Sequence, residues 1–387
     1  MILRKPGKPK YNVPKAYRLI ALLNTLAKVL SVIIAKQMMY YAEKHNLLPP
    51  NHFSGRVKKN ATDVVHLLVH HIKGQWQKEK VVTALFLDIK GAFSNAINEQ
   101  LIHNLKSRWI PSKIIKYVAN MLCDRSTMLR FDDHISKPIK IDNIIGQGDP
   151  LSMALYQFYN ANLVEIPKED EGETVAAYVD DAIITASAAT FDKAHVKLRD
   201  MMTREGKAIG WAKKHNSPFE YNKLTLIDFA HSSRSMERPL LILQSITVNP
   251  TKCIKYLGIM LDQNLNWKEK IVYMQEKGSK WAAQICRATR PSWRLMPRAA
   301  HRLYIGVAIP RIMYSADVWC IPIHVKNEGD RQKGSVYVIC KLTFTQKAGS
   351  LAIMEGFHTS PTDALDAYVS TLPLHLKVER IFHQAAV

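Results

Sequence analysis

Blocks of hydrophobic residues alternate with polar segments along the chain, and their spacing predicts both helices and strands. Apolar residues recur at helical spacing over 22–33, and a second helix is expected from Ala61, with Val65 and Leu68 on its buried side. The run VVTALFLD, residues 81–88, is apolar until its last position and is typical of a buried strand. Further helices are expected over 93–105, 151–164 and 191–209, a β-hairpin region over 123–145, and strands over 220–230 and 254–261.

Two adjacent acidic residues, Asp180 and Asp181, interrupt an apolar run over 174–186. The flanking segments AAYV and AIIT are typical of strands, so the two acids are expected at the tip of a hairpin. Most Asp–Asp pairs are solvated turns, because aspartate suits turns. Here a third acid, Asp88, ends another buried strand, and the glycine-rich segment GQGDPLS, 146–152, lies between them. This order of acid, loop and acid pair resembles that of a polymerase palm.

Three carboxylates within a few ångström of one another would repel, and one would take up a proton unless cations neutralised them. Divalent ions with oxygen ligands do so, and Mg²⁺ keeps coordination positions open for phosphate. Two such ions about 4 Å apart activate a 3′-hydroxyl and stabilise a leaving pyrophosphate. We expect Asp88 and Asp180 to bridge the ions. We expect Asp181 to be a supporting ligand or electrostatic partner, since neighbouring side chains on a strand point to opposite faces.

Two further residues are candidates for nucleotide binding. Phe93 follows Asp88 at the expected start of a helix, where its ring could lie under the incoming sugar and exclude a 2′-hydroxyl. A core phenylalanine that anchors the helix is the alternative. Gln147 stands between Gly146 and Gly148, on a loop whose backbone can approach a nucleotide closely. Glycine-rich turns are common, so this loop by itself is weak evidence.

Positive charge dominates the composition and is unevenly placed. The 387 residues carry 54 Lys and Arg against 33 Asp and Glu, a formal net charge of +21. Eight basic residues and no acid lie between Met1 and Ala42, and ten basic residues lie from Lys268 to Arg311 against Glu269 and Glu276. Basic blocks within foldable sequence favour a polyanion partner, most simply nucleic acid. Charge for solubility is the alternative.

The remaining composition excludes several classes of protein. Five cysteines are scattered without metal-ligand spacing, which indicates a reducing compartment and neither a zinc module nor a disulfide scaffold. No signal peptide is recognised, and the apolar segment 19–35 contains Asn24 and Lys28, so it is expected to be a helix and not a membrane span. We expect a protein of the nucleus or cytoplasm without a membrane partner, and its oligomeric state stays open.

Several motifs resemble those of one family. LFLDIKGAF is similar to its first palm motif, IIGQGDPLSM to its Gln-containing loop, AAYVDDAII to its catalytic hairpin and IKYLGIMLD to the strand that closes the palm. HFSGRVKKNATD and the earlier LRKPGKPKYNVPKAYRLIALLNTLAKVLS resemble its fingers motifs, and AIPRIMYSADVW resembles a thumb segment. Over nearly its whole length the chain thus resembles the reverse transcriptase of a non-LTR (LINE-like) retrotransposon, closest in style to fungal elements.

The resemblance implies an α+β right-hand polymerase fold with an antiparallel palm sheet packed on helices. It implies an RNA-directed DNA polymerase that uses Mg²⁺, or Mn²⁺ in its place, an RNA template, a DNA primer and dNTPs. The expected domains are fingers over 1–84, palm with fingers insertions over 85–264, helical thumb over 265–320 and a connection of unknown role over 321–387. The boundary near 265 rests on the change to basic helical sequence.

The resemblance also implies roles for single residues. It carries metal binding onto Asp88, Asp180 and Asp181. It carries sugar selection onto Phe93 and nucleotide contact onto Gln147.

Two basic residues are assigned to the site only because of the resemblance. Arg56, in the fingers motif, is expected to contact the triphosphate, where a planar bidentate donor suits phosphate oxygens. Lys223 is a candidate acid near the leaving pyrophosphate. A solvated loop charge and an ordinary lysine are the respective alternatives.

Some positions depart from the family pattern. Leu19 and Val57 stand where proline is usual, and Ser54 and Ile144 stand where glycine is usual. If those glycine positions need a positive φ, Ser54 and Ile144 would strain their loops.

Three functions are compatible with these observations. The first is an active reverse transcriptase. The second is a truncated, inactive remnant that only binds nucleic acid, because the chain is expected to start inside the fingers and no endonuclease or ribonuclease H acids are recognised. The third, an RNA-directed RNA polymerase, is disfavoured by Phe93, since such an enzyme needs a polar group near the ribose 2′-hydroxyl.

Overall fold

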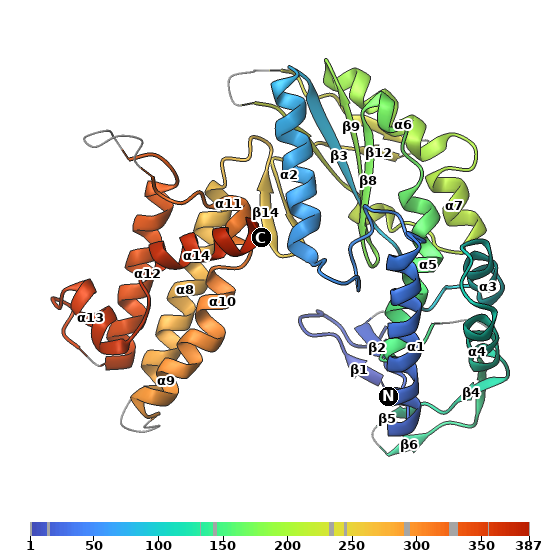
Figure 1. Cartoon of the computed structure of the whole chain (residues 1–387), viewed down its shortest axis with the longest axis horizontal. Helices are drawn as coiled ribbons and strands as arrows, with labels where there is room; N and C mark the ends of the chain where they lie inside the picture. Colours follow the sequence, from blue (N-terminus) through green and yellow to red (C-terminus); the bar gives the residue numbers. More distant parts are fainter. Residues whose placement is uncertain are drawn as a thin grey trace. The chain divides into compact units, whose positions relative to one another are not determined.

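The computed structural model describes residues 2–13, 16–131, 133–141, 145–231, 236–243, 246–289, 295–324, 332–354 and 356–386. Ile144, one of the departures noted above, lies outside these ranges. The chain divides into two compact units, Met1–Thr251 and Lys252–Val387 (Figure 1).

A four-stranded antiparallel sheet forms the centre of the first unit. Its strands are β3 (Val81–Asp88), β8 (Glu173–Tyr178), β9 (Asp181–Ala188) and β10 (Thr225–Phe229), in the order β10-β3-β9-β8. Every residue of β3 except Asp88 is buried, as the apolar run predicts. The α+β class with an antiparallel sheet packed on helices is therefore confirmed.

Helices cover both faces of this sheet. Helix α2 (Ala61–Gln77) packs on the face that carries Ile183, and α6 (Phe191–Thr203) lies on the opposite face, where His195 meets Asp228 at 3.0 Å. Helix α2 begins at Ala61 and buries Val65 and Leu68, as expected. The other helices of this unit are α1 (Thr25–Lys44), α3 (Asn98–Ser107), α4 (Ser112–Leu122), α5 (Pro150–Val164), α7 (Ala208–Lys214) and the 3-10 turns η2 (Glu169–Glu171) and η3 (Tyr221–Lys223).

Short strand pairs complete the first unit. They are β1 (Ile2–Arg4) with β2 (Tyr17–Leu19), β4 (Arg125–Thr127) with β7 (Ile139–Ile141), β5 (Arg130–Phe131) with β6 (His134–Ile135), and β11 (Leu241–Leu243) with β12 (Ile246–Val248). The β5–β6 pair lies within the β4–β7 pair along the chain, which confirms the hairpin region expected over 123–145.

Two expected helices have different bounds. The helix expected to start at Phe93 begins only at Asn98, because residues 90–97 form turns in which Gly91 has a φ of +62°. The helix expected over 191–209 is divided into α6 and α7, and Gly206, with a φ of +72°, lies in the break. Strand β10 is likewise shorter than the expected 220–230, because the turn η3 precedes it.

The apolar positions that predict α1 face solvent. The helix begins at Thr25, with the Asn24 side chain accepting a hydrogen bond from the Ala27 amide. Leu26 is 82% exposed and Ile33 is 47% exposed, whereas the buried residues of α1 are Ser31, Met38, Met39 and Ala42. In α1 the helical spacing thus identifies the helix but not the face that packs, whereas in α2 it identifies both.

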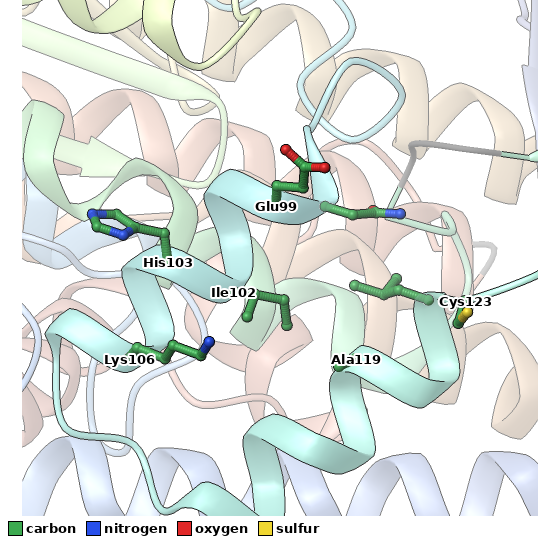
Figure 2. Close-up of a pocket in the computed structure, with 8 residues that line it drawn as sticks. Glu99, Ile102, His103, Lys106, Ala119 and Cys123 are labelled. Carbon is green, nitrogen blue, oxygen red and sulfur yellow. The ribbon is translucent and has the colours of Figure 1, made fainter.

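Helices α3 and α4 line an open surface pocket of about 440 Å³ (Figure 2). Its lining residues are Asn98, Glu99, Ile102, His103, Lys106, Ala119, Leu122 and Cys123. None of the residues expected to bind metal or nucleotide is among them.

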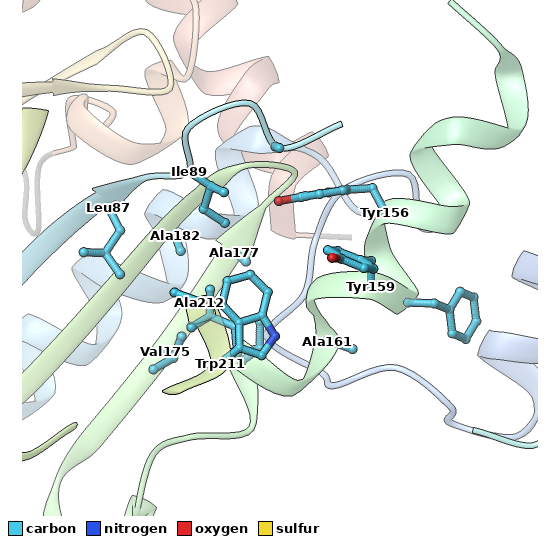
Figure 3. Close-up of a cluster of buried hydrophobic side chains, with 14 of the residues drawn as sticks. Leu87, Ile89, Tyr156, Tyr159, Ala161, Val175, Ala177, Ala182, Trp211 and Ala212 are labelled. Atoms are coloured by element: carbon cyan, nitrogen blue, oxygen red, sulfur yellow. The ribbon is translucent and has the colours of Figure 1, made fainter. Parts of the chain in front are cut away.

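The main hydrophobic core lies between the sheet and α5 (Figure 3). Tyr156 and Tyr159 of α5 are buried with Ala177 and Ala182 of the hairpin strands, and Trp211 of α7 joins them. This core fixes α5 against the hairpin that carries the acid pair.

In its described residues, the second unit is a helical body with a β-hairpin. Its strands are β13 (Cys253–Tyr256) and β14 (Ile259–Asp262), which pair with each other, and β14 packs on α8 (Lys268–Thr289). Its other helices are α9 (Pro297–Leu303), the π-helix η4 (Tyr304–Ala308), α10 (Ile309–Ile312), α11 (Ala316–Trp319), α12 (Val336–Met354), α13 (Thr362–Val369) and α14 (Leu374–Ala386). The single strand expected over 254–261 is instead this β13–β14 hairpin, because Leu257 and Gly258 turn the chain with positive φ values. The hairpin belongs to the second unit, since the first unit ends at Thr251. No helix in the described ranges is both long and apolar enough to cross a membrane.

Candidate active site

The three expected acids gather at one end of the central sheet. Tyr178 pairs with Asp181 across the β8–β9 hairpin, so that Val179 and Asp180 form its tip. Asp88, the last residue of β3, pairs with Asp181 across the neighbouring ladder. The hairpin tip and the strand end predicted from the sequence are confirmed, and the register places Asp181 directly opposite Asp88.

The charges of these acids act on one another. Burial, followed by the charges of Asp180 and Asp88, raises the pKa of Asp181 to about 6. Burial also raises the pKa of Asp180, and the charge of Asp88 adds to this effect. These shifts are expected of carboxylates that need a cation nearby.

Lys223 supplies positive charge at this place. Its Nζ forms an ion pair with Oδ2 of Asp88, and this hydrogen bond raises the pKa of Lys223. The backbone amide of Glu220 donates to the Asp88 carbonyl at 2.8 Å, which fixes the turn η3 beside the end of β3. The structure thus brings Lys223 to Asp88, and its role as an acid near the pyrophosphate stays a prediction.

Two further basic residues were missed in the sequence: Arg18, which interacts with Asp180, and Lys5, which interacts with Lys223. The charge of Arg18 lowers the pKa of Asp180, and burial, with the charges of Arg18, Lys8 and Lys223, lowers the pKa of Lys5. Arg18 lies in β2 and Lys5 follows β1. The only signal was the basic block between Met1 and Ala42, which did not single out these positions.

Phe93 is half-buried next to α5. Its ring centroid lies 4.9 Å from that of Tyr156, with the planes inclined at 35°. Tyr156 is fully buried, and burial together with the charges of Asp180 and Asp88 raises the pKa of its phenol. Phe93 therefore packs on a tyrosine that is close enough to the acids for their charges to act on it, although Phe93 lies in a turn and not in a helix.

The Gly-Gln-Gly loop packs against the segment that follows β2. The Ala21 amide donates to the Gln147 carbonyl at 2.8 Å, and the Gln147 side chain is exposed. Gly148 has a φ of +101°, and a Cβ there would lie 3.0 Å from Ile20 and 3.1 Å from the Ala21 carbonyl oxygen. Glycine is required at 148 both by its backbone conformation and by this close approach.

Arg56 pairs with Glu43 and not with Asp88, Asp180 or Asp181. Its Nε and Nη2 donate to the two carboxylate oxygens of Glu43 at 2.7 and 2.8 Å, and its Nη1 donates to the Pro49 carbonyl at 2.8 Å. The residue is only 8% exposed. These contacts are those of a buried structural ion pair, and they leave the guanidinium unavailable to a triphosphate in this arrangement.

The expected strain at Ser54 is absent. Ser54 is buried and is not among the non-glycine residues with positive φ, whereas its neighbour Gly55 has a φ of +60°. Its carbonyl accepts a hydrogen bond from the Gln157 side chain. The condition for strain at Ser54 is therefore not met, because the left-handed position is one residue later, at Gly55.

The acids do not form a preassembled metal site. Within the described part of the chain, no group of three or more His, Cys, Asp or Glu side chains has an arrangement that could hold a metal ion. The Lys223 ammonium is bound to Asp88 instead. A set of hard carboxylates with one cation already among them nevertheless fits oxygen-preferring divalent ions.

Comparison with known proteins decides the family. The family model for reverse transcriptase (RNA-dependent DNA polymerase) matches residues 3–261, more than half of the chain. The chain belongs to the reverse transcriptase family. This membership confirms the right-hand polymerase fold expected from the motifs.

Relatives of this reverse transcriptase come from insect mobile elements. It is 24% identical over 326 residues to the probable RNA-directed DNA polymerase from transposon BS of Drosophila melanogaster, covering 83% of this chain and 35% of the relative. It is 23% identical to the RNA-directed DNA polymerase from mobile element jockey of the same species, with 83% and 35% covered. The chain thus spans about a third of the length of these relatives. The non-LTR assignment is confirmed, and the fungal style is not confirmed.

Among solved structures, apo telomerase from Candida tropicalis is similar, with a TM-score of 0.43 and 9% identity over 89% of this chain and 60% of that one. This similarity is too low to decide anything about the site.

Proposed function

We propose that this chain is an RNA-directed DNA polymerase of a non-LTR retrotransposon, which extends a DNA primer with dNTPs on an RNA template. The observation that carries this proposal is the convergence of Asp88, Asp180 and Asp181 at one end of the antiparallel sheet. Fingers over 1–84, a palm from 85 and a helical thumb from 265 remain the proposed division. All five cysteines are free thiols, which supports the nucleus or cytoplasm as the location.

The acids would hold Mg²⁺, with Asp88 and Asp180 as bridging ligands and Asp181 as a supporting one. When bound, the ions would neutralise the carboxylates, activate the primer 3′-hydroxyl and stabilise the leaving pyrophosphate. Lys223 is protonated at neutral pH, because its pKa is raised from an already basic value. It can therefore donate a proton, or a hydrogen bond, to the pyrophosphate.

The nucleotide would lie between the acids and the Gly-Gln-Gly loop. Phe93 is proposed to exclude a 2′-hydroxyl by the bulk of its ring, and Gln147 to contact the nucleotide with its exposed side chain. Arg18, whose charge acts on Asp180, and Lys5, whose charge interacts with that of Lys223, replace Arg56 as the proposed partners of the triphosphate.

Template and primer would be bound through their phosphates, in part by basic residues of the second unit. The Lys255 Nζ lies 2.9 Å from the Tyr273 hydroxyl, and the Lys277 Nζ lies 4.4 Å from the centre of the same ring. Lys270 is buried beside them, and its burial, followed by the charges of Lys277 and Lys255, lowers its pKa to about 8. Such a concentration of ammonium groups favours a phosphate backbone as partner.

Primer extension on an RNA template tests the proposal. The purified chain should incorporate dNTPs only with Mg²⁺ or Mn²⁺, and Asp180→Asn should abolish incorporation. Asp170→Asn, which removes an exposed acid of the same unit, is the matched control and should retain activity. RNA binding without incorporation by a folded sample would instead identify an inactive remnant.

Sugar selection has its own test. Phe93→Ala should raise the incorporation of rNTPs relative to dNTPs, because it removes the bulk proposed to meet the 2′-hydroxyl. An unchanged ratio with retained activity would return Phe93 to the role of an ordinary core residue.

A further inference from the structure

The residue before the acid pair holds an unfavourable backbone conformation. Val179 has a φ of +59°, in the left-handed region that β-branched side chains rarely adopt. In a two-residue hairpin turn, when the first of the two central residues has a positive φ, that residue is usually glycine. A valine persists there only when its surroundings hold the turn in place.

Asn160 holds this turn from α5. The side chain is fully buried, and its Nδ2 donates to the Val179 carbonyl at 2.7 Å. Because a carbonyl can only accept, the amide nitrogen must face Val179 and the amide oxygen must face the other way. The orientation of the Asn160 amide is therefore determined by its partners.

His52 binds the other end of the same amide. Its Nε2 lies 2.7 Å from Oδ1 of Asn160, and since that oxygen accepts, Nε2 carries the proton. Burial lowers the pKa of His52 to about 4, so the ring is neutral at physiological pH and keeps this tautomer.

The segment that carries His52 is itself fixed to the hairpin strand. The Phe53 amide donates to the Ala177 carbonyl at 3.0 Å, and the Ala177 amide donates to the Asn51 carbonyl at 3.1 Å. His52 thus lies on a strand-like segment beside β8, and the chain of contacts returns through Asn160 to the tip of the same hairpin.

We propose that Asn160, oriented by His52, is a positioning residue that fixes the direction of the Asp180 carboxylate. The Val179 carbonyl belongs to the planar peptide that joins Val179 to Asp180, so a hydrogen bond to its oxygen fixes that plane. Without this bond the peptide is free to rotate, Val179 leaves the left-handed region, and the Asp180 side chain turns with the backbone. This role rests on the proposed polymerase function.

The test combines loss of the bond with relief of the strain. Asn160→Leu conserves volume but removes the donor, and it should lower kcat on the order of 10- to 100-fold and weaken the apparent affinity for Mg²⁺, with little change in the KM for primer–template. Val179→Gly, which adopts the same φ without penalty, should by itself leave kcat near that of the wild type. In the Asn160→Leu background it should recover about tenfold in kcat.

Gln157→Leu is the matched control. Gln157 lies one turn earlier on the same helix, is equally buried, and donates to the Ser54 carbonyl and not to the hairpin. Gln157→Leu should lower the thermal stability of the protein, and adding Val179→Gly should not restore that stability. Retained kcat in Asn160→Leu, or a loss that Val179→Gly fails to rescue in folded proteins, would overturn the proposal.

Amide hydrogen exchange separates this proposal from the polymerase function. In Asn160→Leu the peptide covering 174–186 should exchange faster than in the wild type, whereas Gln157→Leu should leave it unchanged. If the wild type incorporated no nucleotide, the proposed function would fail, and the exchange data alone would decide whether Asn160 holds the turn. Equal exchange in both variants would refute that role.

Discussion

The ion pair between Arg56 and Glu43 yields the sharpest stability prediction, because its two partners differ in burial. The Arg56 side chain is 6% exposed and that of Glu43 is 32% exposed. Glu43→Gln leaves the guanidinium charge buried with one partner lost, whereas Arg56→Met removes the buried charge and leaves a carboxylate that water can reach. We therefore expect the first variant to be the less stable one.

The magnitudes follow from the same geometry. Removing one partner of a buried pair costs about 3–5 kcal/mol when the other stays buried and charged. We expect about 3 kcal/mol for Glu43→Gln, and about 1–2 kcal/mol for Arg56→Met because Glu43 is partly solvated. The hydrogen bond from Arg56 lowers the pKa of Glu43, so this stabilisation is present above the pKa of an unfolded glutamate and is lost as the pH falls through the lowered value.

Urea unfolding of both variants at pH 7, with steady-state dNTP kinetics on the same samples, is the assay. Glu43→Gln should show the lower midpoint, and Arg56→Met should keep the KM for dNTP of the wild type. If Arg56→Met unfolded like the wild type but raised the KM for dNTP tenfold, Arg56 would be the triphosphate contact that the sequence motif suggests, and the structural reading would be refuted.

Three other outcomes are expected. Since the pKa of Asp181 is raised to about 6, its share of the free energy of unfolding without metal should fall as the pH rises from about 4 to about 6. Asp181→Asn should reduce this fall, and the rest belongs to Asp180, whose pKa is also raised. The variant should be more stable by about 1–2 kcal/mol at pH 7 in urea titrations, after allowance for partial exposure. Gly148→Ala, at a φ of +101°, should lower the free energy of unfolding by about 1–3 kcal/mol and therefore lower the Tm measured by calorimetry. An unchanged Tm would contradict the close packing of the loop. Lys255→Ala and Lys277→Ala should each reduce, by about 1, the slope of log affinity for primer–template against log salt concentration. Lys341→Ala, which removes a lysine 5.4 Å from another tyrosine ring, should leave this slope unchanged.

The acid site could be predicted because local pattern and topology agree there. A buried strand that ends in Asp88 and a hairpin that turns at Asp180 each follow from the order of apolar and polar residues. Antiparallel pairing of neighbouring strands then brings such ends together. The sequence could not reveal the partner of Arg56, because Glu43 lies on a helix that precedes it and no spacing rule connects the two.

Contacts between distant segments explain the other differences. His52 and Asn160 are separated by 108 positions, and each is an unremarkable polar residue in its own segment. The helical pattern of α1 likewise does not show which face of the helix packs on the rest of the unit. Phe93 was expected at the start of a helix because the turns around Gly91 lack a strong local signal.

The exposed apolar face of α1 also governs how this chain must be handled in solution. A net charge of +21 retains cellular nucleic acid, and concentrated salt is the usual way to remove it. Sulfate and similar salts, however, strengthen the association of exposed apolar groups such as Leu26, which is 82% exposed. Purification therefore calls for chloride salts with a mild detergent, or for nuclease digestion, so that release of nucleic acid is not accompanied by precipitation.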